Sequence, residues 1–135
     1  MIIEYLIGIW LIIGMVFDKK FYKVPNFISY SIVVLSIPII IINHTWTQPI
    51  IILAFKLFVA LYFLAAWHFH KFGAADIKVI VPIMLMLSWL QFIAFLSLML
   101  FIGVVIGIYL IFRKGQPVIQ GFVPITIAYW IALMI

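Results

Sequence analysis

Six apolar runs, separated by short polar stretches, make up almost the whole chain. They extend over residues 2–17, 27–42, 50–67, 77–88, 92–112 and 118–135. Each run is apolar on all sides, and none alternates apolar with polar positions as the strands of a membrane barrel do. Because backbone groups in lipid must be paired within the segment, helices are the state that fits these runs. The pattern predicts an all-α integral membrane protein, a bundle of six transmembrane helices that forms a single membrane-embedded domain over residues 1–135.

Polar residues mark the ends of the runs, some of them more clearly than others. Pro25 and Asn26 open the second run, and proline is tolerated at the start of a helix. The weakest boundary lies between the fourth and fifth runs, where only Ser88 and Gln91 interrupt the apolar sequence. The first run has no basic residues before it and no small-residue cleavage site after it. We therefore expect a retained helix there rather than a secretory signal.

Composition supports the membrane interpretation and excludes several functions. Hydrophobic residues make up 70% of the chain and charged residues 8%, against about 45–50% and about 25% in soluble domains. So few charges cannot cover a water-facing surface, which excludes a soluble globular domain. The absence of cysteine excludes disulfides, cysteine-bound zinc and a thiol nucleophile. The net charge of +5 is not gathered in a long basic tract, so we expect no nucleic-acid partner.

The basic residues predict an orientation in the membrane. The connectors after the odd-numbered runs contain or adjoin seven of the eight basic residues, namely Lys19, Lys20, Lys23, Lys71, Lys78, Arg113 and Lys114. By the positive-inside rule these connectors are cytoplasmic, and both termini lie outside. The exception, Lys56, falls within the third run. It either extends toward the outer interface or faces an internal polar partner.

The acidic residues are the main candidates for chemistry. There are three of them, Glu4, Asp18 and Asp76. Glu4 lies near the outer start of the first helix, whereas Asp18 ends that helix and Asp76 begins the fourth, so both aspartates are expected at the cytoplasmic face. Two close carboxyls share one proton, because both cannot ionise together cheaply, and such a pair can act in aspartyl proteolysis. A pair of acids can equally bind a cation or relay protons.

Each aspartate also has a purely structural interpretation. Asp18 could be an ordinary helix end beside Lys19 and Lys20, and Asp76 could be a helix cap that interacts favourably with the helix dipole. The sequence around the two aspartates favours the catalytic interpretation over the structural one.

Two short motifs resemble the signatures of the type IV prepilin peptidase family. The first runs from Asp18 to Asn26 (DKKFYKVPN), and the second from Gly73 to Lys78 (GAADIK). In that family, an aspartate precedes a basic stretch that ends in Ile/Val-Pro-Asn, and a second aspartate lies in a Gly-x-Gly-Asp-x-Lys pattern at the start of the fourth helix. The resemblance also includes six helices and a proline in the last one (GFVP, residues 121–124).

The chain departs from the common family pattern in two respects. Ala75 replaces the second glycine of the aspartate motif, as in archaeal members, which accept a small or hydrophobic residue there. Many bacterial members also carry a cysteine-containing insertion and an N-methyltransferase activity, and this chain has neither the insertion nor any cysteine. It is similar to the minimal peptidases that process archaeal preflagellins and prepilins, or the pilins of Flp/Tad systems.

The resemblance implies a membrane aspartyl endopeptidase that removes the short basic leader of prepilin-like precursors, those with class III signal peptides, at the cytoplasmic face of the cell membrane. Asp18 and Asp76 would be its catalytic residues, with no metal or other cofactor. The residues expected to support the two motifs are Pro25, Asn26, Gly73, Ala75 and Lys78. The expected partners are a prepilin-like or preflagellin precursor as substrate and membrane lipid.

Two other functions fit part of the pattern. A small non-enzymatic, ion-coupled transporter subunit could use Asp18 and Asp76 as cation ligands, but this leaves the Pro-Asn after the first aspartate and the glycine before the second unexplained. A presenilin-like intramembrane protease also uses a Gly-x-Gly-Asp motif. The Tyr-Asp and Pro-Ala-Leu motifs of that class are absent here.

Overall fold

Helices account for the regular structure of the chain. The computed structural model describes residues 2–21, 24–46, 49–68, 74–114 and 121–135, which contain six α-helices and no strand. In chain order they are α1 (Ile2–Phe21), α2 (Asn26–Trp46), α3 (Ile50–His68), α4 (Ala74–Met86), α5 (Trp89–Lys114) and α6 (Phe122–Leu133). The prediction of an all-α chain with six helices is confirmed over these residues.

Several helices continue past the apolar runs that predict them. Helix α1 extends beyond Phe17 to Phe21, and α4 begins at Ala74 rather than at residue 77. The expected ends were therefore wrong: Asp18 lies within the last turns of α1, and Asp76 lies in the first turn of α4. The reason is that apolar periodicity records burial, whereas backbone hydrogen bonding continues through polar residues. Helix α6 begins at Phe122, and residues 118–120 of the last predicted run lie outside the described part of the chain.

The turn between α4 and α5 is sharp and locally capped. The side-chain oxygen of Gln91 accepts hydrogen bonds from the Ser88 backbone N–H at 3.3 Å and from the Ser88 hydroxyl at 3.1 Å. A serine followed three residues later by a glutamine is the spacing of a capping box, in which the glutamine side chain satisfies the N–H that the helix start leaves unpaired. The two residues that marked the weakest predicted boundary are thus the ones that start α5.

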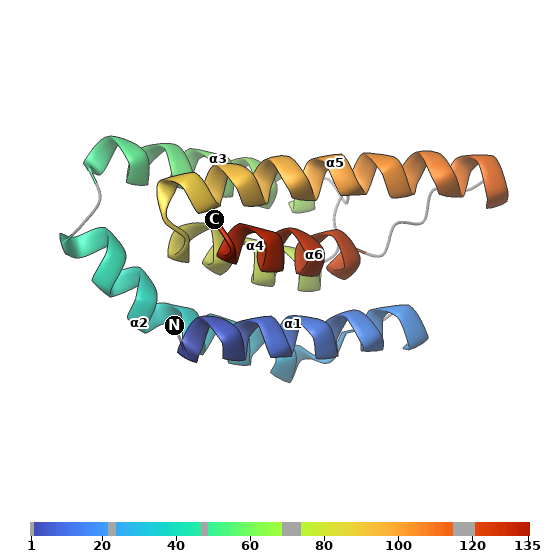
Figure 1. The fold of residues 1–135 in the computed structure, drawn as a ribbon, viewed down its shortest axis with the longest axis horizontal. Coiled ribbons are helices and arrows are strands. Elements are labelled where there is room, and N and C mark those ends of the chain that lie inside the picture. The colour runs from blue at the N-terminus through green and yellow to red at the C-terminus, as the bar shows by residue number, and fades with distance from the viewer. Residues whose placement is uncertain (1, 22–23, 47–48, 69–73, 115–120) are drawn as a thin grey trace.

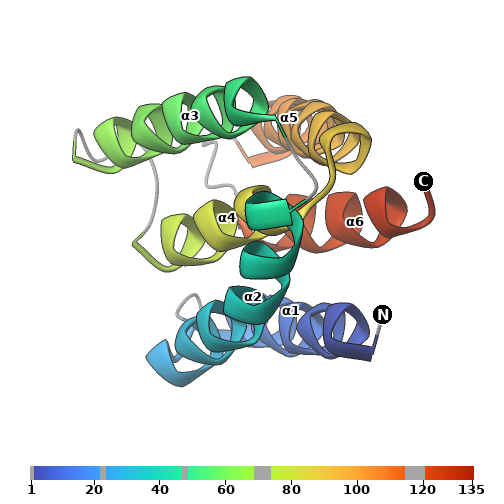
Figure 2. The same cartoon turned by 90° about the vertical axis from the view of Figure 1, so that its left-hand side faces the viewer.

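The six helices lie in three layers of two. Figures 1 and 2 show α3 and α5 on one side, α4 and α6 in the middle, and α1 and α2 on the other side. Most contacts between helices join α5 to α6, α2 to α4, and α1 to α2 and α6. Odd and even helices run in opposite directions, so α1, α3 and α5 end where α2, α4 and α6 begin, at the right of Figure 1. Both termini of the chain lie at the opposite end.

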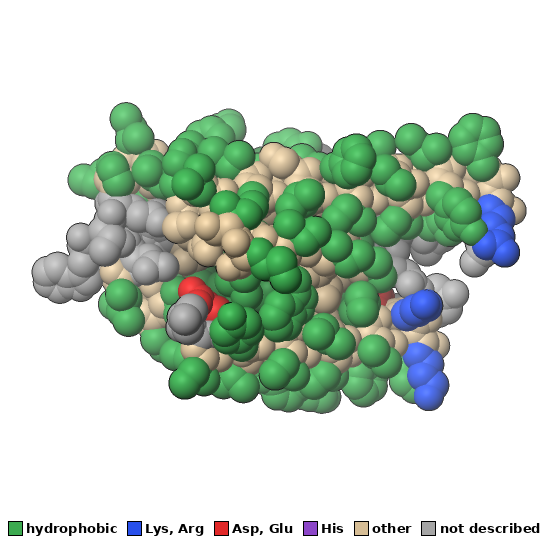
Figure 3. Space-filling view, in the orientation of Figure 1, with side chains coloured by type: hydrophobic (Ala, Val, Ile, Leu, Met, Phe, Trp, Pro, Cys, Tyr) green, Lys and Arg blue, Asp and Glu red, His purple; other side chains and the backbone are tan. Residues whose placement is uncertain are grey.

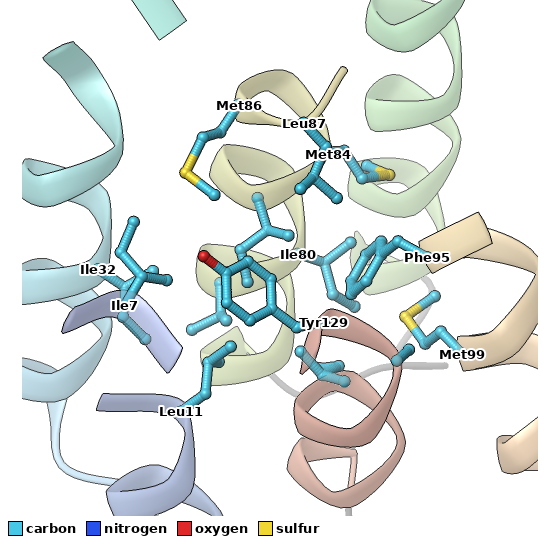
Figure 4. Packing of buried hydrophobic residues seen from close by; sticks show 14 of the residues in the cluster. Ile7, Leu11, Ile32, Ile80, Met84, Met86, Leu87, Phe95, Met99 and Tyr129 are labelled. Atoms are coloured by element: carbon cyan, nitrogen blue, oxygen red, sulfur yellow. The ribbon is translucent and has the colours of Figure 1, made fainter. Parts of the chain in front are cut away.

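The middle layer forms the core. Helix α6 buries seven of its twelve residues, and its Tyr129 side chain lies among Ile7 and Leu11 of α1, Ile80 of α4 and Phe95 of α5 (Figure 4). Figure 4 draws Met84 and Met86 of α4 in the same cluster. Among the described residues, helices α4 and α6 thus each supply more of the buried hydrophobic side chains than any other helix does.

The exterior of the molecule is also apolar. Figure 3 shows hydrophobic side chains over most of the visible surface, and large ones such as Phe58 of α3 and Phe101 of α5 are more than 65% exposed. Within the described residues, Trp89–Arg113 of α5 is the one helical segment that is long and apolar enough to cross a membrane by length and composition. Shorter apolar segments cover Asn26–Ile42, Ile50–Ala66 and Phe122–Leu133.

Lys56 of α3 faces an internal polar partner, one of the two positions left open by the sequence, and does not extend toward the outer interface. Its side chain is fully buried, and its ammonium group donates a hydrogen bond to the backbone carbonyl of Leu87. The same group lies 5.6 Å from the centre of the Phe92 ring. Leu87 lies between α4 and α5, where the helix is interrupted, so its carbonyl is available to a partner outside the helix.

Candidate active site

Polar contacts and close packing hold α6 against α1. The Thr126 hydroxyl lies 2.7 Å from the Phe122 carbonyl and 3.2 Å from the Leu11 carbonyl of α1. One turn further along, the Tyr129 hydroxyl donates to the Glu4 carbonyl at 2.8 Å. Since an interhelical hydrogen bond in a membrane protein contributes about 0.6 kcal/mol on average, these bonds orient α6 more than they stabilise it.

Two glycines allow α1 and α6 to approach closely. A Cβ atom on Gly8 would lie 2.5 Å from the Trp130 ring, and one on Gly14 would lie 2.5 Å from the Phe122 ring. Both separations are far below ordinary van der Waals contact, so each aromatic side chain occupies the space that a glycine leaves open. The direction of α6 and the position of its first turn follow from this fit.

The first turn of α6 brings the two aspartates together. The Phe122 backbone N–H donates to Oδ2 of Asp18, from α1, at 3.4 Å. The carboxyl group of Asp76, from α4, lies against the adjacent Gly121, where a Cβ atom would be only 2.3 Å from its Oδ2. Side chains from two helices far apart in the sequence therefore meet the same helix start.

This position has opposing effects on the Asp18 carboxyl, which lies just beyond the apolar run 2–17. Burial raises the pKa of Asp18 above its ordinary value of 3.8, because a desolvated carboxylate is disfavoured, and the hydrogen bond from Phe122 acts in the opposite direction. The start of α6 carries partial positive charge, which stabilises a negative charge placed beside it. The arrangement can hold a proton on one carboxyl while a negative charge is held nearby.

The other residues of the two predicted motifs lie around this end of the bundle. Asn26 begins α2, and the Pro25 carbonyl accepts the Ile28 backbone N–H at 3.1 Å, as expected for a proline that precedes a helix start. The Lys78 ammonium lies 5.3 Å from the centre of the Tyr30 ring of α2. Ala75 lies in the first turn of α4, and Gly73 lies outside the described residues.

Sequence reasoning placed both aspartates at one depth but missed the element that joins them. Gly121 and Phe122 were noted only as the start of a proline-containing segment, although they contact the carboxyl groups of Asp76 and Asp18. The available signal was the Gly-x-x-Pro spacing, because proline is favoured in the first turn of a helix. That spacing marks a helix start but does not reveal what the helix start contacts.

The fold and the site together define an apolar helical protein that carries two carboxyl groups at one end of its helix bundle. The sequence matches the type IV leader peptidase family over residues 5–108, and the chain belongs to this family. The matched part includes most of α1, all of α2 to α4 and most of α5, and therefore both aspartates. No curated protein and no solved structure matches the chain. Family membership makes the protein a type IV leader peptidase-like protease of a membrane-associated family.

Proposed function

We propose that this protein is an aspartyl endopeptidase that spans the membrane with six helices and removes the short basic leader of prepilin-like precursors at the cytoplasmic face. Asp18 and Asp76 are its catalytic pair. The observation that carries the proposal is the meeting of both carboxyl groups at the first turn of α6. Family membership supports the protease over the ion-coupled transporter, because it accounts for both motifs around the aspartates.

The proposed reaction uses the two carboxyl groups in different protonation states. The ionised carboxylate takes a proton from a water molecule, whose oxygen attacks the scissile carbonyl carbon. The protonated partner donates its proton to the carbonyl oxygen, so no separate oxyanion forms. The carboxyl that took the proton from water then gives it to the amide nitrogen as the carbon–nitrogen bond breaks. The other carboxylate takes a proton from a hydroxyl of the gem-diol, which becomes the carbonyl of the new carboxylic acid, so the pair again holds one proton. The single proton belongs to the pair of carboxyl groups, and the burial that raises the pKa of Asp18 favours its retention in the site.

The charge distribution supports cleavage on the cytoplasmic side. The basic side chains visible in Figure 3 gather at the end where α1 and α5 end, and Lys19, Lys20 and Arg113 are exposed there. By the positive-inside rule this end is cytoplasmic, and it is the end that carries both aspartates. The leader of a prepilin-like precursor precedes its hydrophobic helix on that side. The basic residues contact anionic lipid headgroups rather than the leader, which is itself basic.

The test is co-expression of the full chain with a candidate precursor that has a short basic leader before a hydrophobic helix, with cleavage measured by gel shift. Asn has nearly the shape of Asp but cannot take up the proton. Asp18→Asn and Asp76→Asn are therefore each expected to lower the cleavage rate by about 100- to 10,000-fold. The double variant is expected to be no worse than either single variant, as for residues that act as a unit.

Glu4→Gln is the matched control. Glu4 lies in the first turn of α1, at the end of the molecule opposite the aspartates, and the substitution keeps the backbone carbonyl that Tyr129 contacts. Its cleavage rate is expected to equal that of the unmodified chain. Substantial cleavage by either Asp→Asn single variant, at an equal level of membrane-inserted protein, would exclude the catalytic pair. If Asp76 were only a helix cap, Asn would replace it with little loss.

A further inference from the structure

We propose that Gly121 is a positioning residue of the aspartyl site: the missing side chain at this position is what allows the Asp76 carboxyl to lie against the first turn of α6, beside Asp18. The inference rests on the proposed function, since it concerns the geometry of the same two carboxyl groups. It assigns a role to a residue that lies outside both aspartate motifs and outside the matched family segment, residues 5–108.

The contact between Gly121 and Asp76 involves the whole carboxyl group. A Cβ atom on Gly121 would lie 2.3 Å from Oδ2 of Asp76, 2.5 Å from Cγ and 2.7 Å from Oδ1. Carbon and oxygen atoms that are not bonded do not approach so closely in proteins. The Asp76 carboxyl therefore occupies the volume that any side chain at position 121 would need.

The backbone conformation shows that space, rather than flexibility, is the reason for glycine here. Gly121 has φ −60° and ψ −30°, an ordinary right-handed helical conformation that every L-residue adopts easily. Gly121 is the N-cap of α6, a position at which alanine is less favourable than glycine. A weaker cap lowers the stability of the helix but does not act on the reacting atoms, so a loss of kcat per folded molecule in Gly121→Ala requires another cause.

The close approach places both carboxyl groups at the start of α6. The Phe122 N–H binds Asp18, and Gly121, the residue before it, contacts Asp76. The partial positive charge at the start of α6 thus acts on both carboxyls and favours one negative charge shared between them. A Cβ atom would push the Asp76 carboxyl out of its position against the helix start. Because this carboxyl ends a short side chain that can rotate, the expected damage is to the site rather than to the fold.

The experiment compares Gly121→Ala with Gly103→Ala in the purified full chain, using the same precursor as above. Gly103 of α5 is a matched control, because a Cβ atom there would meet nothing within 4 Å. We expect Gly121→Ala to lower kcat/KM by about 100-fold, the loss that follows from a misplacement of about 1 Å in a catalytic group. The loss should lie in kcat per folded molecule, with KM unchanged and the unfolding temperature lowered by no more than the weaker N-cap accounts for. Gly103→Ala should keep the activity of the unmodified chain.

The pH profile of kcat/KM separates a positioning role from a purely structural one. Displacing Asp76 removes stabilisation of the shared negative charge, so the first ionisation of the pair requires a higher pH. The acid limb of the profile is therefore expected to move upward by about half to one pH unit in the residual activity of Gly121→Ala. A residue that only helped the chain to fold would lower the amount of active protein and leave the limb in place.

A second variant covers the case in which Gly121→Ala unfolds. Combining it with Asp76→Ala removes the carboxyl that the new Cβ atom meets, so the double variant should unfold below Asp76→Ala alone by no more than the cost of the weaker N-cap. Failure of this restoration would overturn the inference.

Asp18→Asn and Asp76→Asn are measured in parallel, so that the two proposals fail separately. If both Asn variants are inactive and Gly121→Ala keeps full kcat with an unmoved acid limb, the positioning role is wrong and the catalytic pair stands. If an Asn variant stays active, the proposed function is wrong, and this inference with it.

Discussion

At the scale of the residue, the clearest feature is the position of Asp18 between burial and a hydrogen-bond donor. Burial raises the pKa of its carboxyl, and the Phe122 N–H opposes this rise. The same carboxyl accepts a hydrogen bond from the Phe122 N–H in the first turn of α6. The N-cap residue, Gly121, has no side chain that could accept this bond. Asp18 thus acts as a cap supplied by a distant helix. In the proposed catalytic role, this burial would lower the stability of the fold while it serves the reaction.

This opposition predicts that Asp18→Asn does not destabilise the fold at neutral pH. With its pKa raised above 3.8, the folded chain holds the Asp18 proton more tightly than the unfolded chain does. The free energy of unfolding therefore falls as the pH rises from 3.8 through the raised value. Asn is neutral at every pH, so the variant should unfold at pH 7 at a temperature at least equal to that of the unmodified chain.

The measurement is thermal unfolding in detergent at pH 4 and pH 7. The difference in unfolding temperature between Asp18→Asn and the unmodified chain should shrink toward pH 4, where the Asp18 carboxyl takes up its proton and becomes neutral like asparagine. A lower unfolding temperature for Asp18→Asn at pH 7 would mean that the hydrogen bond to Phe122 outweighs burial.

Lys78 is predicted to matter less than either aspartate, although it lies only two residues after Asp76. Its ammonium group is placed over the Tyr30 ring of α2, and such a contact contributes about 0.5–1 kcal/mol when the groups keep access to water, as the half-buried Lys78 does. Lys78→Ala should therefore lower the cleavage rate by less than about 10-fold. Near-complete inactivation at a normal protein level would contradict this and place Lys78 in the catalytic machinery.

At the scale of the element, the fit between α1 and α6 controls the site. Glycines on α1 admit aromatic side chains of α6, and hydroxyl groups of α6 contact backbone carbonyls of α1. Both interactions fix α6 relative to Asp18. Helix α4, which lies with α6 in the middle layer, brings Asp76 to the same helix start. The site is therefore a property of three helices packed together rather than of any loop.

Gly8→Ala is predicted to destabilise this helix pair. The new Cβ atom would lie 2.5 Å from the Trp130 ring, and overpacking of this kind costs about 1–3 kcal/mol. Gly103→Ala, which meets open space, should cost nothing. Both are measured as shifts in unfolding temperature in detergent.

The double variant Gly8→Ala with Trp130→Leu tests the cause, because leucine vacates the space of the ring. It should be more stable than the sum of the two single changes. Strict additivity would show that the collision does not account for the loss.

At the scale of the whole molecule, charge and apolar surface are separated along the bundle. Exposed basic residues gather at the end that carries the aspartates, and the sides of the molecule are apolar (Figure 3). Adjacent helices run in opposite directions, with both chain ends away from the site (Figure 1). This distribution is the one expected when lipid surrounds the sides of the bundle and the basic end lies on the cytoplasmic side.

Reporter fusions after Lys20, Thr47 and Lys114 test this orientation. The positive-inside rule predicts cytoplasmic reporter activity for the fusions after Lys20 and Lys114 and external activity for the fusion after Thr47. A cytoplasmic signal from the Thr47 fusion would overturn the six-span arrangement with external termini.

Hydrophobic pattern alone was enough to predict the helices, because each apolar run is long, uninterrupted and bounded by polar residues. It also placed Asp18 and Asp76 at one end of the bundle, since helices that alternate in direction return to the same side. The predicted end of α1 and the predicted start of α4 were each several residues off, because the pattern records burial and not backbone hydrogen bonding. Lys56 could not be assigned either, because its partner, the Leu87 carbonyl, belongs to the backbone and has no signature in the side-chain sequence.

The sequence by itself determined which residues are the candidates for the chemistry: two aspartates in family motifs, within a strongly apolar chain. Only the tertiary structure decided how they meet. The contact at Gly121 and Phe122 depends on the packing of α6 against α1, which brings residues far apart in the chain within a few ångströms of each other. A single sequence records local periodicity and composition. Helix packing determines which side chain fills the space beside a glycine, and this contact produces no pattern in the local sequence.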